Sequence, residues 1–287
     1  MTGAGRPWPG RLSLNQATVK KLSLDEAVGL CARHDIPAIG LWREPVAEAG
    51  LAHAAAAIRA AGLHVSSLCR GGFFTHADPA ARAAAIADNQ AAIAEAAELG
   101  TDTLVLVSGG LVPGSRDLPL ARRMVADAIG ELVPAAQEHG VRLAIEALHP
   151  MFAADRCVIT SLGEALDLAL QFPADAVGVV VDTYHVWWDA ALFAGIARAG
   201  ERIASYQVCD WVLPLPADVL LGRGHVGDGC IDFPPISAAV AAAGYTGYVE
   251  VEIFNETVWS APPDETAATV RQRFPLAAPT AWRDTDA

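Results

Sequence analysis

The sequence predicts one closed α/β barrel, the (β/α)8 TIM barrel, as a single domain over residues 1–287. Three observations lead to this fold class. Short apolar runs typical of strands alternate with longer segments typical of helices, and the alternation gives eight pairs. Connections from a helix to the next strand are short, whereas several connections that follow a strand are long. The length of 287 residues suits one large α/β domain better than two ordinary domains.

The predicted strands are short apolar runs, of which residues 177–181 are a clear example. In chain order they occupy residues 12–16, 38–42, 65–69, 103–107, 142–146, 177–182, 203–208 and 248–253. A doubly wound sheet is the competing layout, but it explains eight regular strand–helix units less well.

The predicted helices lie between these strands and carry local start and stop signals. They occupy residues 24–34, 46–61, 79–99, 118–139, 162–171, 189–199, 235–243 and 263–273. Ser23 with Glu26, and Ser161 with Glu164, predict capping boxes. Four glycines follow helices at positions that favour a left-handed residue: Gly62, Gly100, Gly140 and Gly244. The long connections after strands, residues 108–116, 147–160 and 209–233, are where barrel enzymes build their sites.

Composition and charge exclude several kinds of partner. The chain is 53% hydrophobic and carries a formal net charge of -13, so it builds a sizeable core and repels polyanions. We therefore expect no nucleic-acid partner and no membrane partner. Residues 1–10, a short extension, lack signal-peptide features, and no run approaches the ~20 apolar residues of a membrane span. Residues 279–287 are predicted to form a polar tail.

The cysteines predict a reducing compartment. Their number, five, is odd, their spacing is irregular, and no C-x-x-C pair occurs. A disulfide scaffold and a zinc ribbon are therefore not expected, and a cytoplasmic location is. Cys31, Cys69 and Cys209 lie in or beside apolar runs, so we expect them to be buried small apolar residues.

Oxygen-bearing side chains lie at or near the ends of separate predicted strands. They are Glu146, Asp182, Gln207 and Glu252. In a parallel barrel the carboxyl ends of the strands converge on one face. Three carboxylates meeting there would repel one another unless a cation joined them, so the sequence predicts one divalent metal and hence an enzyme. This ligand set suits Mn²⁺ or Mg²⁺, with Co²⁺ as a further candidate.

Several short motifs in order carry a family resemblance. They are Leu143-Ala-Ile-Glu146, Asp182-Thr-Tyr-His185, Gln207-Val-Cys-Asp210, Gly227-Asp-Gly-Cys-Ile-Asp-Phe233 and Gly247-Tyr-Val-Glu-Val-Glu252. Together they resemble the xylose-isomerase-like TIM-barrel family, which includes sugar isomerases and epimerases and the endonuclease IV fold. The resemblance runs from about Leu12 to Phe274. It implies that Glu146, Asp182 and Glu252 bind the metal.

One ligand departs from the common family pattern. Many relatives have a His where this chain has Gln207, and an amide oxygen shifts the preference further toward Mg²⁺ or Mn²⁺. A Gln at this place resembles the hydroxypyruvate-isomerase-like branch. Glu250 has the same strand parity as Glu252, and we expect it to be a buried partner of a Lys or Arg.

The resemblance also implies how protons move. Glu146 and Glu252 are expected to remove and return a carbon-bound proton while binding the metal. His185 is expected to contact a substrate oxygen, with a bond to a backbone carbonyl as the alternative. His149 is either a loop-structuring residue before Pro150 or an additional acid or base, which would suit β-elimination.

Four more residues are candidates for substrate binding. Arg70 and Arg223 could each hold a carboxylate, phosphate or hydroxyl, or pair with a surface acid. Trp42 and Trp187, near predicted strand ends, could form apolar walls for a sugar ring or simply pack in the fold.

The resulting functional hypothesis is an isomerase or epimerase of a keto-sugar or small hydroxy-keto acid that works through a metal-stabilised enediolate. The alternative is a lyase in the same fold, such as a sugar or inosose dehydratase, or a subunit that cleaves C-glycosides of 3-keto sugars. A homo-oligomer is expected, or a second subunit under the lyase alternative. A DNA-repair endonuclease is disfavoured by the net charge of -13, and a non-catalytic sugar sensor would lack bound metal.

Overall fold

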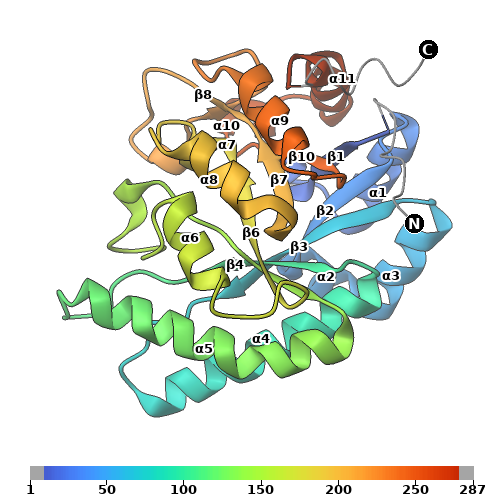
Figure 1. Cartoon of the computed structure of the whole chain (residues 1–287). Coiled ribbons are helices and arrows are strands. Elements are labelled where there is room, and N and C mark those ends of the chain that lie inside the picture. The colour runs from blue at the N-terminus through green and yellow to red at the C-terminus, as the bar shows by residue number, and fades with distance from the viewer. Residues whose placement is uncertain (1–9, 278–287) are drawn as a thin grey trace. The chain divides into compact units, whose positions relative to one another are not determined.

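The computed structural model describes residues 10–277. Eight parallel strands close a barrel in the order β1-β10-β7-β6-β5-β4-β3-β2, and helices separate them along the chain (Figure 1). The predicted (β/α)8 fold is thereby confirmed. The predicted extension, except for Gly10, and the predicted tail at 279–287 lie outside the described residues.

The chain divides into two compact units, one ending at Ser66 and resuming at Ser205, the other comprising Ser67–Ala204. That the whole chain is one domain stays a prediction. β3 (His64–Gly72) and β7 (Ile203–Val208) each have residues in both units.

The first unit contains strands β1, β2 and β10 of the barrel and a two-stranded antiparallel sheet. Its strands are β1 (Leu12–Asn15), β2 (Ala38–Trp42), β8 (Asp210–Trp211), β9 (Arg223–Gly224) and β10 (Val249–Val251). Its helices are α1 (Leu24–Arg33), α2 (Arg43–Ala49), α3 (Leu51–Ala60), α9 (Phe233–Ala242), α10 (Glu256–Ser260) and α11 (Pro263–Arg273), with 3₁₀ turns η1 (Gln16–Val19), η4 (Val219–Leu221) and η5 (Phe274–Ala277). Buried Leu14 pairs with Ile39 on one side and with Val251 on the other.

The second unit contains three consecutive barrel strands and their helices. Its strands are β4 (Thr103–Val107), β5 (Arg142–Ile145) and β6 (Val177–Asp182). Its helices are α4 (Pro79–Leu99), α5 (Leu118–His139), α6 (Leu162–Ala169), α7 (Thr183–Val186) and α8 (Leu192–Ala199), with 3₁₀ turns η2 (Pro150–Phe152) and η3 (Gly200–Arg202). Ala144 of β5 pairs with Val105 of β4 and with Gly178 of β6.

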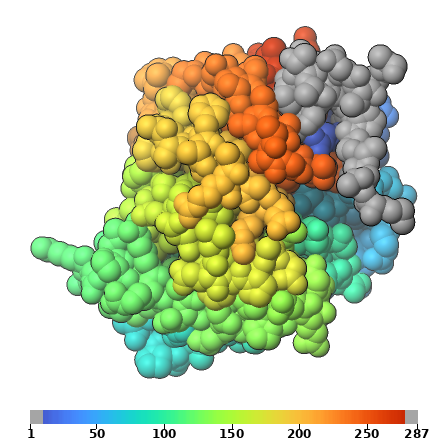
Figure 2. All heavy atoms as spheres, viewed as in Figure 1, coloured from blue at the N-terminus to red at the C-terminus, as the bar shows by residue number. Residues whose placement is uncertain are grey.

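The long helices α4 and α5 pack against each other in the second unit. Helix α5 is amphipathic, and the chain just before it stands out from the surface in the space-filling view, where it is green (Figure 2). No helix among the described residues has both the length and the hydropathy required to cross a bilayer.

The structure corrects one predicted helix and one predicted capping box. The segment 46–61 is not one helix, because Gly50 adopts a φ of 87° and separates α2 from α3. The capping box at Ser23 and Glu26 is confirmed. At the second predicted box, Ser161 caps the Glu164 N–H, but the Glu164 carboxylate accepts instead from Thr160 N–H at 2.8 Å.

All five cysteines are free, and only Cys230 is exposed. The predicted burial of Cys31, Cys69 and Cys209 is confirmed, and burial raises the pKa of the Cys31 thiol to about 12. We expect a chromogenic aromatic disulfide, which reports free thiols by absorbance, to react with one thiol per chain in the native protein and with all five in denaturant. Cys230→Ser should abolish the native reaction, whereas a second rapid thiol would contradict the buried assignment.

Candidate metal and proton-transfer site

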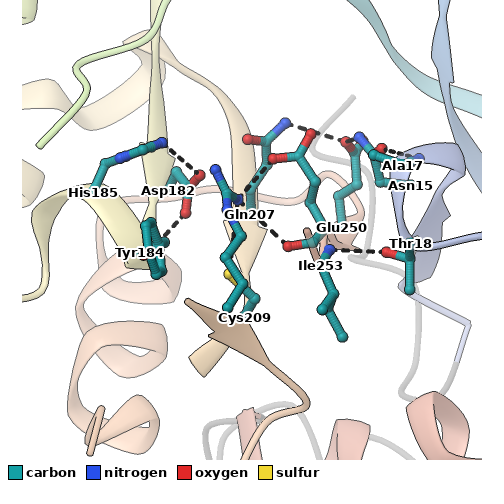
Figure 3. A network of polar contacts seen from close by, with 12 residues as sticks. Asn15, Ala17, Thr18, Asp182, Tyr184, His185, Gln207, Cys209, Glu250 and Ile253 are labelled. Carbon is teal, nitrogen blue, oxygen red and sulfur yellow. Dashed lines mark hydrogen bonds and ion pairs between the residues drawn. The ribbon is translucent and has the colours of Figure 1, made fainter. Parts of the chain in front are cut away.

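Glu146 and Asp182 lie together at the carboxyl ends of the neighbouring strands β5 and β6. Glu146 directly follows β5, and its backbone N–H donates to the Leu106 carbonyl at 3.1 Å. Asp182 ends β6 and caps α7, because its carboxylate accepts from the Tyr184 N–H at 2.8 Å (Figure 3). Possible ligand atoms of Glu146, Asp182 and His185 all lie within 4.8 Å of one another, and all three residues are buried.

This spacing has an electrostatic consequence. Two buried carboxylates repel each other, and burial removes the water that would otherwise screen them. Glu146 is 6% exposed and Asp182 is 1% exposed. The pair is therefore stabilised by a cation or by a shared proton. The arrangement can hold a divalent metal, and it can exchange a proton with a bound molecule.

His185 lies beside this pair, and its bonds indicate its tautomer. Its Nδ1 accepts a hydrogen bond from the backbone N–H of His149 at 3.1 Å, while Nε2 lies 3.8 Å from Oδ2 of Asp182. Because Nδ1 accepts, the neutral ring carries its proton on Nε2. That nitrogen is then a hydrogen-bond donor and not a metal ligand. The expected contact of His185 with a substrate oxygen and the alternative bond to a backbone carbonyl both stay predictions.

His149 shapes the loop that follows β5. Its Nδ1 accepts from the Met151 N–H at 3.2 Å and so caps η2, and its ring packs edge-on against Trp188 at a centroid distance of 5.3 Å. Burial lowers the pKa of His149 below its usual range, so the neutral ring persists to lower pH than in a free histidine. With Nδ1 accepting, the neutral ring carries its hydrogen on Nε2 and is a hydrogen-bond donor there.

In the first unit, the side-chain amide oxygen of Gln207 accepts no hydrogen bond from the described residues. The Gln207 side chain is 1% exposed, and its Nε2 donates to Oε1 of Glu250 at 3.1 Å (Figure 3). Its Oε1 is buried and has no hydrogen-bond partner among the described residues. An unpaired buried carbonyl oxygen is unfavourable, so this atom suits a cation that binds oxygen.

Glu250 fixes which way this amide points. Its carboxylate accepts from Asn15 Nδ2 at 2.6 Å and from Ser66 Oγ at 2.5 Å, as well as from Gln207. The carboxylate lies against Gly40, where an added Cβ would come within 2.5 Å of it. The donors in these bonds are two amides and a hydroxyl, and the carboxylate holds the Gln207 nitrogen toward itself. The expected Lys or Arg partner of Glu250 stays a prediction.

Glu252 follows β10 and is braced on both sides. The Thr18 hydroxyl donates to the Val251 carbonyl at 3.0 Å and accepts from the Ile253 N–H at 2.9 Å, so the backbone on either side of Glu252 is held (Figure 3). The Glu252 N–H donates to the Val208 carbonyl at 3.2 Å. The buried carboxylate is thus presented from a rigid segment.

Arg223 pairs with Glu252 inside the protein. Its Nη1 donates to Oε2 of Glu252 at 2.8 Å, and both side chains are buried. The alternative that Arg223 pairs with a surface acid is therefore wrong, because the β8–β9 hairpin turns the arginine inward, and its role in substrate binding stays a prediction. Asp210 anchors this hairpin loop by accepting from the backbone N–H groups of Gly227 and Ile231.

The remaining predicted residues lie as follows. The Arg70 guanidinium stacks on Phe73, 4.5 Å from the ring centroid, and its expected role in substrate binding stays a prediction. Trp42 ends β2, and its indole N–H donates to Asn15 Oδ1 at 2.9 Å. Trp187 follows α7 and is half-buried.

Sequence reasoning missed Asn15, Gln16 and Thr18. Asn15 ends β1, and Gln16 and Thr18 lie in η1 directly after it, so all three lie at a carboxyl strand end, as the selected residues do. Their signal was available: a polar Asn15-Gln16 pair closes an apolar strand. It was overlooked because neither residue carries a charge.

A family profile described as xylose isomerase-like TIM barrel matches residues 26–274. The chain belongs to this family. The structure of protein SMc04130 from Sinorhizobium meliloti 1021 is similar to this xylose isomerase-like barrel, with 47% sequence identity and a TM-score of 0.91. The match covers 94% of this chain and 98% of that chain. The IolI protein with a bound zinc atom shares the fold at a TM-score of 0.81 and 20% identity, covering 93% of this chain and 98% of that one.

Relatives of this xylose isomerase-like chain include named enzymes. An inosose isomerase from Bacillus licheniformis is 25% identical over 150 residues, which cover 51% of this chain and 52% of the relative. A 3-dehydroshikimate dehydratase from Pseudomonas aeruginosa is 34% identical over 170 residues, which cover 58% of this chain and 25% of the relative. The match thus spans about half the length of the isomerase and a quarter of the dehydratase.

Proposed function

We propose that this protein is a divalent-metal-dependent isomerase or epimerase that moves a proton at a carbon next to a ketone. The observation that carries the proposal is the buried cluster of Glu146, Asp182 and His185 at the ends of β5 and β6. Two buried carboxylates so close together repel each other, and a divalent cation between them relieves this repulsion. His185 presents an N–H, not a positive charge, beside them.

The donor chemistry of the other unit supports the same cation. Gln207 offers a buried oxygen with no hydrogen-bond partner in residues 10–277, and Glu252 ends the next strand of the barrel order. We propose that Glu146, Asp182, Gln207 and Glu252 bind one ion. The support is positional, because the carboxyl ends of parallel barrel strands share one rim. An all-oxygen set of this kind favours Mn²⁺ or Mg²⁺, with Co²⁺ as a further candidate.

Each side chain then has a defined task. When bound, the ion polarises a carbonyl and its neighbouring hydroxyl. Glu146 and Glu252 exchange the proton on the carbon, one removing it and the other returning it. Arg223 donates to Oε2 of Glu252 and so orients the carboxylate for this work. His185 donates its Nε2 proton as a hydrogen bond to a substrate oxygen.

The substrate class follows from the relatives together with the chemistry. An inosose and 3-dehydroshikimate are both six-membered rings in which a ketone neighbours hydroxyl-bearing carbons. We propose a hydroxy ketone of this type, either a keto-sugar, a keto-polyol or a small hydroxy-keto acid. The acidic surface, with its net charge of -13, supports a small-molecule substrate in place of nucleic acid or membrane partners. A cytoplasmic location and a homo-oligomer complete the proposal.

The test combines metal analysis with proton exchange. We expect purified protein to contain about one equivalent of Mn²⁺ or Mg²⁺ per chain after reconstitution, measured by elemental analysis. With inosose, ketohexoses or 3-dehydroshikimate in deuterium oxide, proton NMR should show deuterium entering at the carbon beside the ketone, and EDTA should stop it. Protein that binds no divalent metal and catalyses no exchange on any of these ketones would refute the proposal.

A lyase is the second candidate, and His149 favours it. Its neutral ring presents an Nε2–H in the loop after Glu146, where it can donate a hydrogen bond to the hydroxyl group that elimination removes. His149→Gln should lower elimination by about a hundredfold or more while sparing deuterium exchange, because exchange depends on the two glutamates. Equal loss of both reactions, with folding unchanged, would assign His149 a structural role. His139→Gln, on the exposed end of α5, is the matched control. Only the lyase candidate implies a second, different subunit as a partner.

A further inference from the structure

The turn that follows β1 lies against the end of β10 within the first unit. Leu14 of β1 pairs in parallel with Val251 of β10, so the chain leaving β1 runs beside the chain leaving β10. The first of these segments is η1, which contains Thr18, and the second begins with Glu252. Thr18 is 0% exposed, so its hydroxyl has no access to water and bonds within the protein.

The two hydrogen bonds of the Thr18 hydroxyl enclose Glu252 along the chain (Figure 3). The hydroxyl donates to the Val251 carbonyl at 3.0 Å and accepts from the Ile253 N–H at 2.9 Å. Because β10 ends at Val251, the Ile253 N–H lies beyond the strand. One side chain therefore fixes the backbone on both sides of Glu252 at the point where regular strand pairing stops.

The turn that carries Thr18 is itself anchored. The Asn15 side chain accepts from the Ala17 N–H at 2.8 Å and so caps η1. The Trp259 indole N–H of α10 donates to the Ala17 carbonyl at 2.7 Å. Thr18 is also β-branched, which restricts its χ1 angle. The hydroxyl is thus held in place by its own turn and by α10.

Glu252 is consequently held at both ends of its side chain. Arg223 Nη1 donates to the carboxylate at 2.8 Å, and Thr18 fixes the backbone from which the carboxylate extends. A shift of this backbone would move the carboxylate with it. Metal ligands bind well only when they are held within about 0.5 Å of the required geometry.

We propose that Thr18 is a positioning residue for Glu252, which holds the carboxylate where it binds the divalent metal. The inference rests on the proposed function, which makes Glu252 a ligand. In the alternative, the hydroxyl only satisfies two backbone groups and contributes to stability alone. The two roles differ in one measurable quantity, because a purely structural hydroxyl would leave the metal affinity of the folded protein unchanged.

The test measures Mn²⁺ binding without substrate or turnover. Thr18→Val keeps the branched shape of the side chain and removes the hydroxyl. The Mn²⁺ dissociation constant of the full-length protein should rise by about tenfold to a hundredfold, the usual effect of losing a group that orients a metal ligand. Electron paramagnetic resonance of free Mn²⁺ measures it. Thr18→Ser keeps the hydroxyl and should bind Mn²⁺ within about threefold of wild type.

Thr103→Val is the matched control. Thr103 is also buried, and its hydroxyl donates to Asp102 at 2.9 Å, but it begins β4 and so lies at the amino end of a strand. Its substitution should lower the free energy of unfolding, measured in urea, and leave the Mn²⁺ dissociation constant unchanged.

Amide hydrogen exchange in EDTA-treated protein tests the geometry itself. Thr18→Val should speed exchange at the Ile253 N–H, which loses its acceptor. The Val249 N–H, which donates to the Arg11 carbonyl at 2.7 Å, should keep its protection and serves as the internal reference.

Two results would overturn the role of Thr18 alone. One is a destabilised Thr18→Val protein that binds Mn²⁺ as tightly as wild type, and the other is a Thr18→Ser protein that binds it as weakly as Thr18→Val. Thr18→Ala, which also lacks the hydroxyl, replaces Thr18→Val if that variant does not fold. Wild-type protein that binds no Mn²⁺ would instead refute the proposed function and this inference with it.

Discussion

Glu146→Gln should lower metal-dependent deuterium exchange by about a hundredfold to ten-thousandfold, the range expected when a general base is lost. The amide keeps the shape of the side chain and cannot accept the carbon-bound proton. The same change removes one of two neighbouring buried carboxylates, so the EDTA-treated variant should melt at a higher temperature than wild type. Exchange is measured by proton NMR, and melting by circular dichroism.

The two readouts together separate a catalytic role from a structural one. A residue that only supports the fold would lose activity and stability together. Glu131→Gln is the matched control, because Glu131 lies in an exposed ion pair with Arg82 and should change neither quantity appreciably. Exchange at the wild-type rate in Glu146→Gln would show that another group takes the proton.

The fold could be predicted closely where local signals agree. The strands at residues 38–42, 103–107, 177–182 and 203–208 and the helices at residues 79–99, 118–139 and 263–273 have the predicted bounds, since apolar runs and terminal Pro or Gly residues mark both ends. The missed break at Gly50 has a different origin. A glycine inside an alanine-rich segment is compatible with a continuous helix, and packing decides that it takes a positive φ.

The candidate site was predictable in part for a physical reason. Glu146 and Asp182 meet because they end adjacent parallel strands, and strand ends can be read from the sequence. The pairing of Arg223 with Glu252 could not be read in this way, because a two-stranded hairpin with no regular apolar pattern aims the arginine. The contacts of Asn15 and Thr18 likewise depend on side-chain packing between strands.

Arg223→Met should destabilise the protein by on the order of 3–5 kcal/mol, the usual consequence of leaving a buried charge without its partner. The Arg223 and Glu252 side chains are 3% and 5% exposed, so water cannot replace the lost guanidinium. Urea unfolding measures this loss of stability, and EDTA treatment ensures that no metal cation neutralises the Glu252 carboxylate in place of Arg223. Adding Glu252→Gln to the variant should recover much of it, since no unpaired carboxylate then remains.

The surface pair of Arg198 and Asp167 provides the control for this argument. Both side chains are largely exposed, at 48% and 67%, so Arg198→Met should change stability by less than about 1 kcal/mol. If Arg223→Met is equally mild, then Glu252 finds another partner, and the buried pair does not hold the β8–β9 hairpin against β10. If the loss is large and the double variant restores it, the same arginine that supports the fold also orients the Glu252 carboxylate for proton transfer.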